Sequence, residues 1–181
     1  MILREAFTGE MGAVGALRVG AYEAQRLLDV NPPYAAILSA LGSDGHGIVL
    51  VAAEDGAVED GAVEDGAAEG KGNTWAGGLL GTVMLEPWHD GSEVARDQRE
   101  AEVRALGVAP QAQGRGVGRA LMLAVIDRAR AAGARRLLLS TQPGMEAAQA
   151  LYLSLGFARL PELDWSPAPG LTLLAFGLAL E

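Results

Sequence analysis

Three glycines at alternate positions, within Gln113-Gly114-Arg115-Gly116-Val117-Gly118, give this sequence its clearest chemical signal. They follow a pattern typical of a buried strand and precede one typical of a helix. Glycines let the backbone approach a ligand closely, and the N–H groups of such a loop and of the first helical turn are free to bind an anion. The loop therefore suits a phosphate group, and a glycine-rich turn without a ligand is the alternative.

The spacing of these glycines disfavours the two common nucleotide motifs. The dinucleotide fingerprint needs glycine at its first, third and sixth positions. Counted from Gly114 the sixth position is Arg119, and counted from Gly116 it is Leu121. The Gly-Lys-Ser/Thr of the P-loop is absent as well. The spacing alone therefore gives no support to ATP or NAD as the ligand, although a nucleotide-binding module stays an alternative.

The composition excludes several classes of protein. The chain has 181 residues, of which 50% are hydrophobic and 20% charged, as in one globular domain. It contains no Cys, which excludes a disulfide scaffold, a thiolate nucleophile and Cys-ligated metals. His46 and His89 are isolated in the sequence, so we expect loop histidines and no metal site. The sequence shows neither a run of 18 apolar residues nor a signal-peptide pattern, so we expect a cytoplasmic protein without a membrane partner.

The formal net charge of −9 is unevenly distributed. Seven acids and no base lie between Glu54 and Glu69, whereas residues 115–136 hold six Arg and a single acid, Asp127. An anionic small molecule can be drawn to the Arg-rich stretch even though the whole chain is acidic. We expect no nucleic-acid partner, because the basic run is short and the chain as a whole repels a polyanion.

The acidic segment is an internal repeat. Residues 54–68 read Glu-Asp-Gly-Ala-Val twice and then Glu-Asp-Gly-Ala-Ala. Each unit has almost nothing to bury, so we interpret about 54–72 as a low-complexity loop inserted into a single domain that spans 1–181. A calcium loop is the alternative, but the spacing matches no EF-hand pattern.

Hydrophobic periodicity predicts strands alternating with helices. We expect helices over residues 9–28, 34–41, 119–132 and 146–155, and strands over residues 1–7, 47–53, 79–85, 102–108, 137–141, 157–160 and 171–180. Residues 86–99 form a polar connection, and residues 161–170, which contain Trp165, form a loop. The strand over 102–108 precedes the glycine loop and is expected at the centre of the sheet.

Two blocks of this pattern resemble the Gcn5-related N-acetyltransferases, the GNAT family. Gln113, Gly116 and Gly118 match the family's Gln/Arg-x-x-Gly-x-Gly/Ala, and Leu151-Tyr152-Leu153-Ser154-Leu155-Gly156-Phe157 matches its Leu-Tyr-x-x-x-Gly-Phe. The close resemblance covers about residues 102–157. It implies an α/β (α+β) fold with a mixed, mostly antiparallel sheet that is splayed at the middle strand and flanked by helices.

The resemblance also implies acetyl-CoA as co-substrate and assigns the residues that bind it. The pyrophosphate lies on the N–H groups of the glycine loop, and the pantetheine arm pairs with the central strand. The implied residues are Leu106, Gly107, Val108, Gln113, Gly114, Arg115, Gly116, Val117, Gly118 and Arg119. The side chains of Arg115 and Arg119 either add positive charge there or are solvated surface arginines.

The same resemblance implies two catalytic residues. Glu102 matches a position where some members carry the base that deprotonates the amine, directly or through a water; an exposed strand-end Glu is the alternative. Tyr152 matches the general acid that protonates the CoA sulfur; a packed helix aromatic is the alternative. A main-chain N–H near Val108 stabilises the oxyanion. Many relatives carry Asn where this chain has Met145, which puts that contact with pantetheine in doubt.

The expected function follows from these residues. We predict transfer of an acetyl group from acetyl-CoA to a primary amine of a small molecule or peptide, by direct attack in a ternary complex. A non-catalytic acyl-CoA-binding sensor is the alternative. Trp165 either lines the acceptor pocket or anchors its loop. We expect a monomer or homodimer.

Overall fold

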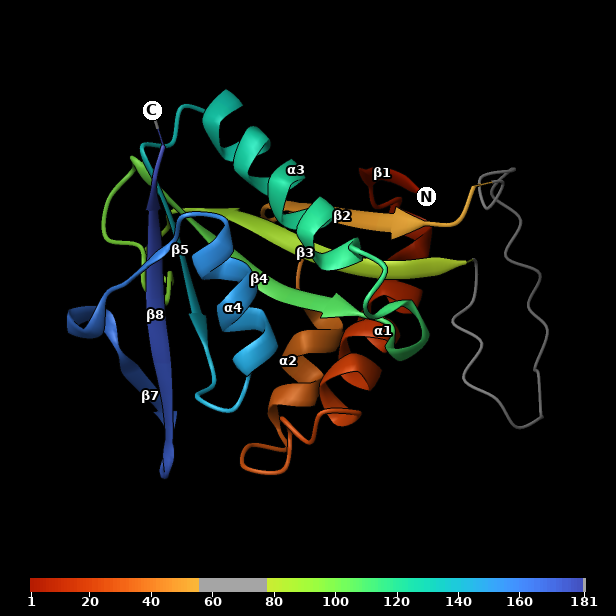
Figure 1. Cartoon of the computed structure of the whole chain (residues 1–181), viewed down its shortest axis with the longest axis horizontal. Helices are drawn as coiled ribbons and strands as arrows, with labels where there is room; N and C mark the ends of the chain where they lie inside the picture. The colour runs from red at the N-terminus through yellow and green to blue at the C-terminus, as the bar shows by residue number, and fades with distance from the viewer. Residues whose placement is uncertain (56–77, 181) are drawn as a thin grey trace.

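The computed structural model describes residues 1–55 and 78–180 of the chain (Figure 1). The predicted acidic insertion over about 54–72 lies outside the described residues except for Glu54 and Asp55. That the chain forms a single domain stays a prediction.

An eight-stranded sheet forms the centre of the described structure, with strand order β1-β2-β3-β4-β5-β8-β6 and with β7 paired to β8. The β4–β5 pair is parallel and the other described pairs are antiparallel. This confirms the predicted mixed, mostly antiparallel sheet. The strands are β1 (Ile2–Glu5), β2 (Ile48–Ala53), β3 (Leu79–Pro87), β4 (Glu100–Val108), β5 (Arg136–Thr141), β6 (Ala158–Arg159), β7 (Trp165–Ala168) and β8 (Leu171–Ala179).

Helices cover both faces of this sheet (Figure 1). A Cβ added at Gly81 would meet α3, whereas one at Gly107, which faces the same way as its partner Thr82, would meet α1. Neighbouring residues of a strand point to opposite faces, so α3 and α1 lie on opposite sides. The helices are α1 (Met11–Glu23), α2 (Tyr34–Ala40), α3 (Val117–Ala131) and α4 (Glu146–Ser154), with short 3₁₀ turns η1 (Thr8–Glu10), η2 (Pro110–Ala112) and η3 (Pro161–Leu163).

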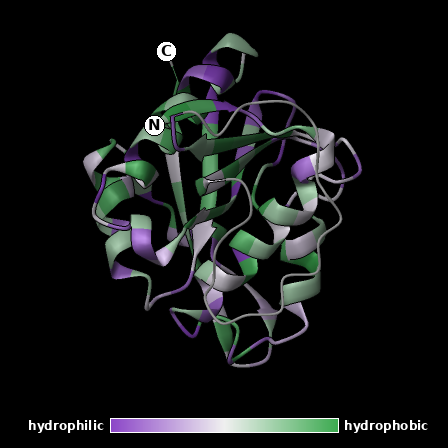
Figure 2. Ribbon diagram, turned by 90° about the vertical axis from the view of Figure 1, so that its right-hand side faces the viewer, coloured by the Kyte–Doolittle hydropathy of each residue, from purple (hydrophilic) through white to green (hydrophobic). Residues whose placement is uncertain are grey.

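The apolar face of α3 accounts for much of the core. Leu121, Met122, Val125 and Ala129 of this helix are fully buried against the sheet. Leu121, Val125 and Ala129 are spaced four residues apart on one helical face, and all three belong to the apolar pattern that predicted the helix. Figure 2 shows the same partition, with hydrophobic strands in the interior and hydrophilic residues on outer turns of the helices.

Several elements differ from the prediction, among them the three that follow. The first helix ends at Glu23 instead of residue 28, because Arg26 takes a left-handed conformation (φ 58°) that a helix cannot continue. Helix α3 begins at Val117, two residues early. The segment predicted as a loop over 161–170 contains β7, which turns through Pro169-Gly170 to pair with β8. Pro167 hid this strand in the sequence, yet it is tolerated because β7 is an edge strand that pairs with β8 among the described residues.

The predicted splay of the middle strand is confirmed. Strand β4 pairs with β5 over Glu100–Val103 and not beyond. Just after this point the register of β4 against β3 shifts, and Ala105 has a positive φ of 51°. Such a bulge bends the strand and ends its pairing. The last residues of β4 therefore leave β5 and present an open backbone edge.

Helices α1 and α2 pack closely through a glycine. A Cβ added at Gly15 would lie 2.5 Å from the backbone oxygen of Ser39 and 3.0 Å from its Cα. At the same junction Arg18 is fully buried and donates to the carbonyl of Leu41 at 2.6 Å, at the end of α2. A glycine at position 15 is thus required by contact with the neighbouring helix.

We predict opposite effects for alanine at two glycines of α1. Gly15→Ala should lower the free energy of unfolding by about 1–3 kcal/mol, because backbone atoms of α2 must move to admit the methyl group. Gly12→Ala should raise it by up to about 1 kcal/mol, because nothing lies within 4 Å of the new Cβ and alanine favours a helix. Urea titration of both variants checks this, and equal effects would show that the α1–α2 contact does not constrain position 15.

Candidate functional site

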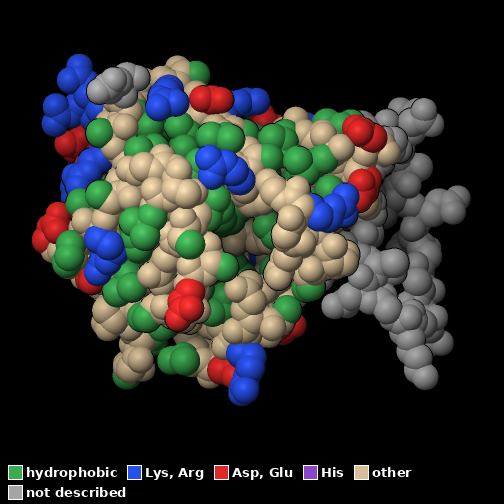
Figure 3. Space-filling view, in the orientation of Figure 1, with side chains coloured by type: hydrophobic (Ala, Val, Ile, Leu, Met, Phe, Trp, Pro, Cys, Tyr) green, Lys and Arg blue, Asp and Glu red, His purple; other side chains and the backbone are tan. Residues whose placement is uncertain are grey.

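A groove runs along the open edge of β4, between the start of α3 and helix α4 (Figure 3). Its volume is about 440 Å³. The structure brings together here most of the residues that the sequence predicted for binding acetyl-CoA, together with Tyr152. Those on its walls are Leu106, Val108, Gln113, Gly114, Gly116, Val117, Gly118, Arg119 and Tyr152.

Unpaired backbone donors gather at the end of this groove where α3 begins. The first hydrogen bond of α3 runs from Ala120 N–H to the carbonyl of Gly116, and the N-cap residue Gly116 offers no side chain to cap the helix. Within the described residues, no hydrogen bond uses the backbone N–H groups of Gly114, Gly116, Val117, Gly118 and Arg119. Free N–H groups at a helix N-terminus carry partial positive charge. The loop can therefore bind an anion.

The space in front of these donors is open. Gly114 and Gly116 both have positive φ, 75° and 80°, and a Cβ at either position would meet nothing within 4 Å. The backbone is thus turned outward with room for a ligand. A pyrophosphate fits this set of donors, since it needs several N–H groups close together and no metal from the protein.

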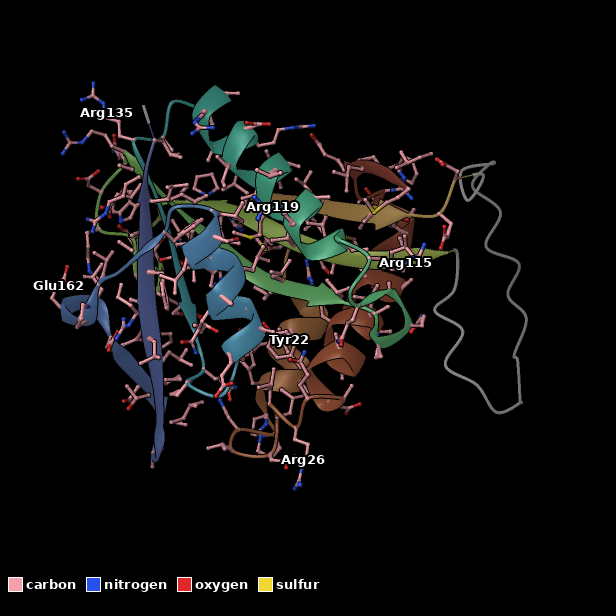
Figure 4. The ribbon with its side chains drawn as sticks, in the orientation of Figure 1. Tyr22, Arg26, Arg115, Arg119, Arg135 and Glu162 are labelled. Atoms are coloured by element: carbon pink, nitrogen blue, oxygen red, sulfur yellow. The ribbon has the colours of Figure 1, made fainter. Side chains whose placement is uncertain are left out.

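The two arginines of the loop lie in different surroundings (Figure 4). Arg119 lines the groove and donates to the hydroxyl of Ser154 at 3.0 Å. Arg115 is absent from the groove wall and forms a 3.0 Å ion pair with Glu54. Of these two side chains, Arg119 is the better placed to add charge to an anion site.

The end of β4 supplies further free backbone groups. Ala109 N–H donates to Leu80 of β3 at 2.9 Å. Since neighbouring N–H groups of a strand point to opposite edges, the N–H of Val108 points to the open edge. Leu106 and Val108 line the groove there, whereas Gly107 faces α1. A linear amide chain could pair with this edge as an added strand does.

Tyr152 is held at the groove by the end of α4. The N–H groups of Gly156 and Phe157 donate to the carbonyls of Leu153 and Tyr152, and Gly156 has a φ of 91°, which is the Schellman arrangement. The Tyr152 ring packs on Phe157 and Phe176 at centroid distances of 6.0 and 6.1 Å. Burial raises the pKa of the Tyr152 phenol above its ordinary value. The side chain is 4% exposed and keeps its proton at neutral pH.

A second, smaller cavity of about 70 Å³ lies beyond the groove, between the sheet, α1, α2 and the β7–β8 hairpin. Met145 lines both spaces, so it stands at their junction. The polar and aromatic residues of this second cavity are Tyr22, Asn31, Tyr34, Glu93, Arg104, Ser140, Thr141, Gln142 and Trp165. Figure 4 shows Tyr22 at the end of α1 near α4. The sequence analysis named Trp165 and missed Tyr22, Tyr34, Glu93 and Arg104, because no motif or spacing links residues that four different segments supply.

Charged side chains form a network in this second cavity. Arg104 donates to Glu86 at 3.0 Å and also to Glu93. Burial acts to lower the pKa of Arg104, but Glu93 and Glu86 outweigh it and the pKa lies above its ordinary value. Burial raises the pKa of Glu93, which Arg104 opposes and the nearby Glu102 and Glu86 reinforce. The phenols of Tyr22 and Tyr34 have raised pKa values, chiefly through burial, and are uncharged at neutral pH.

Glu102, the predicted base, lies beneath the β3–β4 connection. Its side chain is 1% exposed and is absent from the walls of the groove and of the second cavity. One carboxylate oxygen accepts the N–H groups of Val94 and Ala95 at 2.5 and 2.6 Å, and the other has no partner among the described residues. The alternative of an exposed strand-end Glu is wrong, because the connection folds over it. Its role as the base stays a prediction.

Met145, which stands where many relatives carry Asn, and the two nearby glutamines all make hydrogen bonds within the protein. Met145 precedes α4, and its sulfur accepts a hydrogen bond from the Thr141 hydroxyl at 3.2 Å. Gln149 reaches back to the carbonyl of Pro143 at 2.9 Å, and Gln142 to that of Leu27 at 2.9 Å. The side-chain amides of both glutamines are thus engaged with backbone carbonyls.

Two general features of the described residues bear on the kind of site. They contain no group of three or more His, Asp or Glu side chains placed to hold a metal ion. None of the helices that the structure describes is long and apolar enough to cross a bilayer.

Comparison with known proteins gives consistent similarities. A mycothiol acetyltransferase of Renibacterium salmoninarum is 46% identical over 65 residues, which are 36% of this chain and 19% of that protein. The N-alpha-acetyltransferase RimI of Mycobacterium tuberculosis is 43% identical over 61 residues, 34% of this chain and 37% of that protein. The chain thus matches well under half the length of these relatives. The structure of yncA from Salmonella typhimurium with its cofactor acetyl-CoA has a TM-score of 0.64 at 21% identity, over 100% of this chain and 94% of that one.

A longer match identifies the family. Residues 31–157 match the acetyltransferase (GNAT) family, and this range contains both sequence blocks, the splayed strand and the groove-lining residues other than Gln25. With the anion loop, the open strand edge and Tyr152 in one groove, the chain belongs to the GNAT family of acetyltransferases.

Proposed function

We propose that this protein transfers an acetyl group from acetyl-CoA to a primary amine of a small molecule or peptide. One observation carries the proposal: the unpaired N–H groups at the start of α3 open into a groove that is lined by Tyr152 and that shares Met145 with a second cavity, which Glu93 lines. The similar protein names, an N-alpha-acetyltransferase and a mycothiol acetyltransferase, support a peptide or small-molecule acceptor. Acetyl-CoA supplies the activated acetyl group as a thioester.

The chain's residues divide the binding of acetyl-CoA between two segments. The free N–H groups of Gly114 and of residues 116–119 bind the pyrophosphate, with the Arg119 side chain adding charge. The open edge of β4 at Leu106 and Val108 pairs with the pantetheine amides. Gln113 lines the same groove.

The chemistry needs an oxyanion donor and an acid. Val108 N–H, on the open edge, donates to the thioester carbonyl oxygen as that oxygen gains negative charge. The amine nitrogen bonds to the carbonyl carbon and the carbon–sulfur bond breaks. Tyr152 gives its phenolic proton to the departing sulfur and regains one that the nitrogen loses, so that amide and free CoA thiol result. The attack is direct, within a ternary complex.

We predict that alanine substitutions at two glycines with positive φ, one at each end of α3, affect stability equally but CoA binding differently. Gly116→Ala and Gly133→Ala both place a methyl group at a φ near 80° with nothing within 4 Å. Each should lower the free energy of unfolding by about 1–2 kcal/mol. Only Gly116→Ala should weaken CoA, by about tenfold or more, because it obstructs the pyrophosphate donors. Calorimetric titration with CoA checks this, and equal affinities in the two variants would contradict the assigned loop.

We predict that Tyr152→Phe lowers kcat by about 100-fold, because it removes the proton donor and keeps the ring that packs on Phe157 and Phe176. The Kd for acetyl-CoA should stay within about twofold. Since burial raises the pKa of Tyr152, its ionisation should limit the wild-type rate only above about pH 10. Stopped assays of free CoA thiol measure kcat, and an undiminished kcat would remove Tyr152 as the acid.

The proposal as a whole is tested by incubating the full chain with acetyl-CoA and a panel of primary amines. Expected are acetylated amine and free CoA in equal amounts. Binding of acetyl-CoA without transfer to any amine would instead indicate a non-catalytic acyl-CoA-binding protein.

A further inference from the structure

Two glutamates of the β3–β4 region, Glu93 and Glu102, lie in different surroundings. Glu102 occupies the strand position expected for the base but does not line the second cavity, whereas Glu93 does. Glu93 belongs to the polar connection between β3 and β4, directly before the two residues whose N–H groups Glu102 accepts. Their contacts therefore assign different tasks to the two carboxylates.

We propose that Glu93 is the carboxylate that binds the acceptor's primary ammonium group and takes its proton, and that Glu102 is a positioning residue that holds Glu93 in the cavity. This inference rests on the proposed acetyl transfer. The ammonium gives one proton to Glu93, which later releases it to solvent. The resulting neutral amine attacks the thioester, and its second proton replaces the one that Tyr152 passes to sulfur.

Electrostatics favour a cation beside Glu93. The charged groups that face it are Arg104 and Glu102 of β4 and Glu86 of β3, with the uncharged phenols of Tyr34 on α2 and Tyr22 on α1. Arg104 pairs with Glu86 and Glu93, and the nearby Glu102 adds a third carboxylate. The buried Arg18, beside Tyr22, Tyr34 and Arg104, adds a second guanidinium, so the carboxylates exceed the guanidiniums by one when all are ionised. An ammonium group relieves this excess, whereas a carboxylate would add to it.

Aromatic side chains complete the cavity for the same ligand. The ring centroids of Tyr22 and Tyr34 lie 6.4 Å apart with their rings tilted by 48°, and Trp165 lines the same cavity. Aromatic faces attract ammonium groups. The cavity of about 70 Å³ suits an unbranched aliphatic ammonium head, with the rest of the acceptor outside it. Glu93 itself keeps a 22% exposed side chain, so a ligand can reach it.

Glu102 is suited to positioning instead. Its carboxylate accepts two consecutive N–H groups, of Val94 and Ala95, in a fully buried place. These bonds fix the chain immediately after Glu93. Replacing Glu102 by Ala leaves two buried donors without partners, whereas Gln retains an acceptor oxygen at the same position.

The test compares Glu93→Gln, Glu102→Gln, Glu102→Ala and the exposed control Glu162→Gln (Figure 4) in the full chain, with n-butylamine and phenethylamine as acceptors. At pH 7, Glu93→Gln should lower kcat/KM for the amine by about 100-fold.

The rate of the Glu93→Gln variant should rise about tenfold per pH unit toward the amine pKa near 10, since only free amine then reacts. Glu102→Gln should lose no more than about threefold, and Glu102→Ala should chiefly raise KM for the amine. Glu162→Gln should match the wild type.

A second measurement, of ligand binding without turnover, tests the role of Glu93 independently of the proposed acetyl transfer. n-Butylammonium, which cannot be acetylated when acetyl-CoA is left out, should bind the wild type and not Glu93→Gln, while both proteins bind acetyl-CoA equally. If the wild type binds this cation, Glu93→Gln does not, and the wild type acetylates none of the amines, then acetyl transfer is overturned and the cation site stands. Acetylation undiminished in Glu93→Gln, or a larger loss in Glu102→Gln than in Glu93→Gln, would overturn the inference and leave acetyl transfer. Absence of both binding and transfer would overturn both.

Discussion

The parting of β4 from β5 after Val103 is the constraint on which the rest of this structure depends. A sheet normally satisfies every backbone group of a central strand, yet here the end of β4 has a partner on one side, β3. Ala105 takes a positive φ at this point, a strain of about 1–3 kcal/mol that glycine would reduce. The gap exposes the Val108 N–H on one face of the opening and leaves room beside Val103 and Arg104 for the second cavity.

The ends of two helices supply the polar groups of this opening. Helix α3 starts without a cap and so presents unpaired donors, while α4 ends in a Schellman turn that fixes Tyr152 against Phe157. Both depend on short local patterns, glycines before one helix and Gly-Phe after the other. The Leu-Tyr-x-x-x-Gly-Phe block therefore has a direct physical meaning: the glycine permits the turn, and the phenylalanine packs on the tyrosine that the turn positions.

This locality explains which parts of the site the sequence could predict. The loop at 113–119 and Tyr152 were predictable because a few adjacent residues determine the shape of each. The splay was predictable through the family resemblance, but no residue type at Ala105 signals a bulge. The second cavity was not predictable, since Tyr22, Tyr34, Glu93 and Arg104 meet only when the sheet and both N-terminal helices have packed. Glu102 could be placed on its strand, but whether its side chain met solvent or a covering loop depended on the path of residues 88–99.

Charge separation along the opening fits the two unlike substrates of the proposed acetyl transfer. The donors of α3 and Arg119 make one end attractive to a pyrophosphate, and the surplus of carboxylates around Arg104 makes the other end attractive to an ammonium group. Each end repels the substrate of the other, so neither blocks the other's site. Tyr152 lines the groove between these poles and carries no charge at neutral pH. In the proposed reaction the pyrophosphate and the ammonium group bind at opposite ends of the opening, which brings the thioester and the amine close to Met145, a residue that lines both spaces. Direct attack in such a complex requires no covalent acetyl-enzyme.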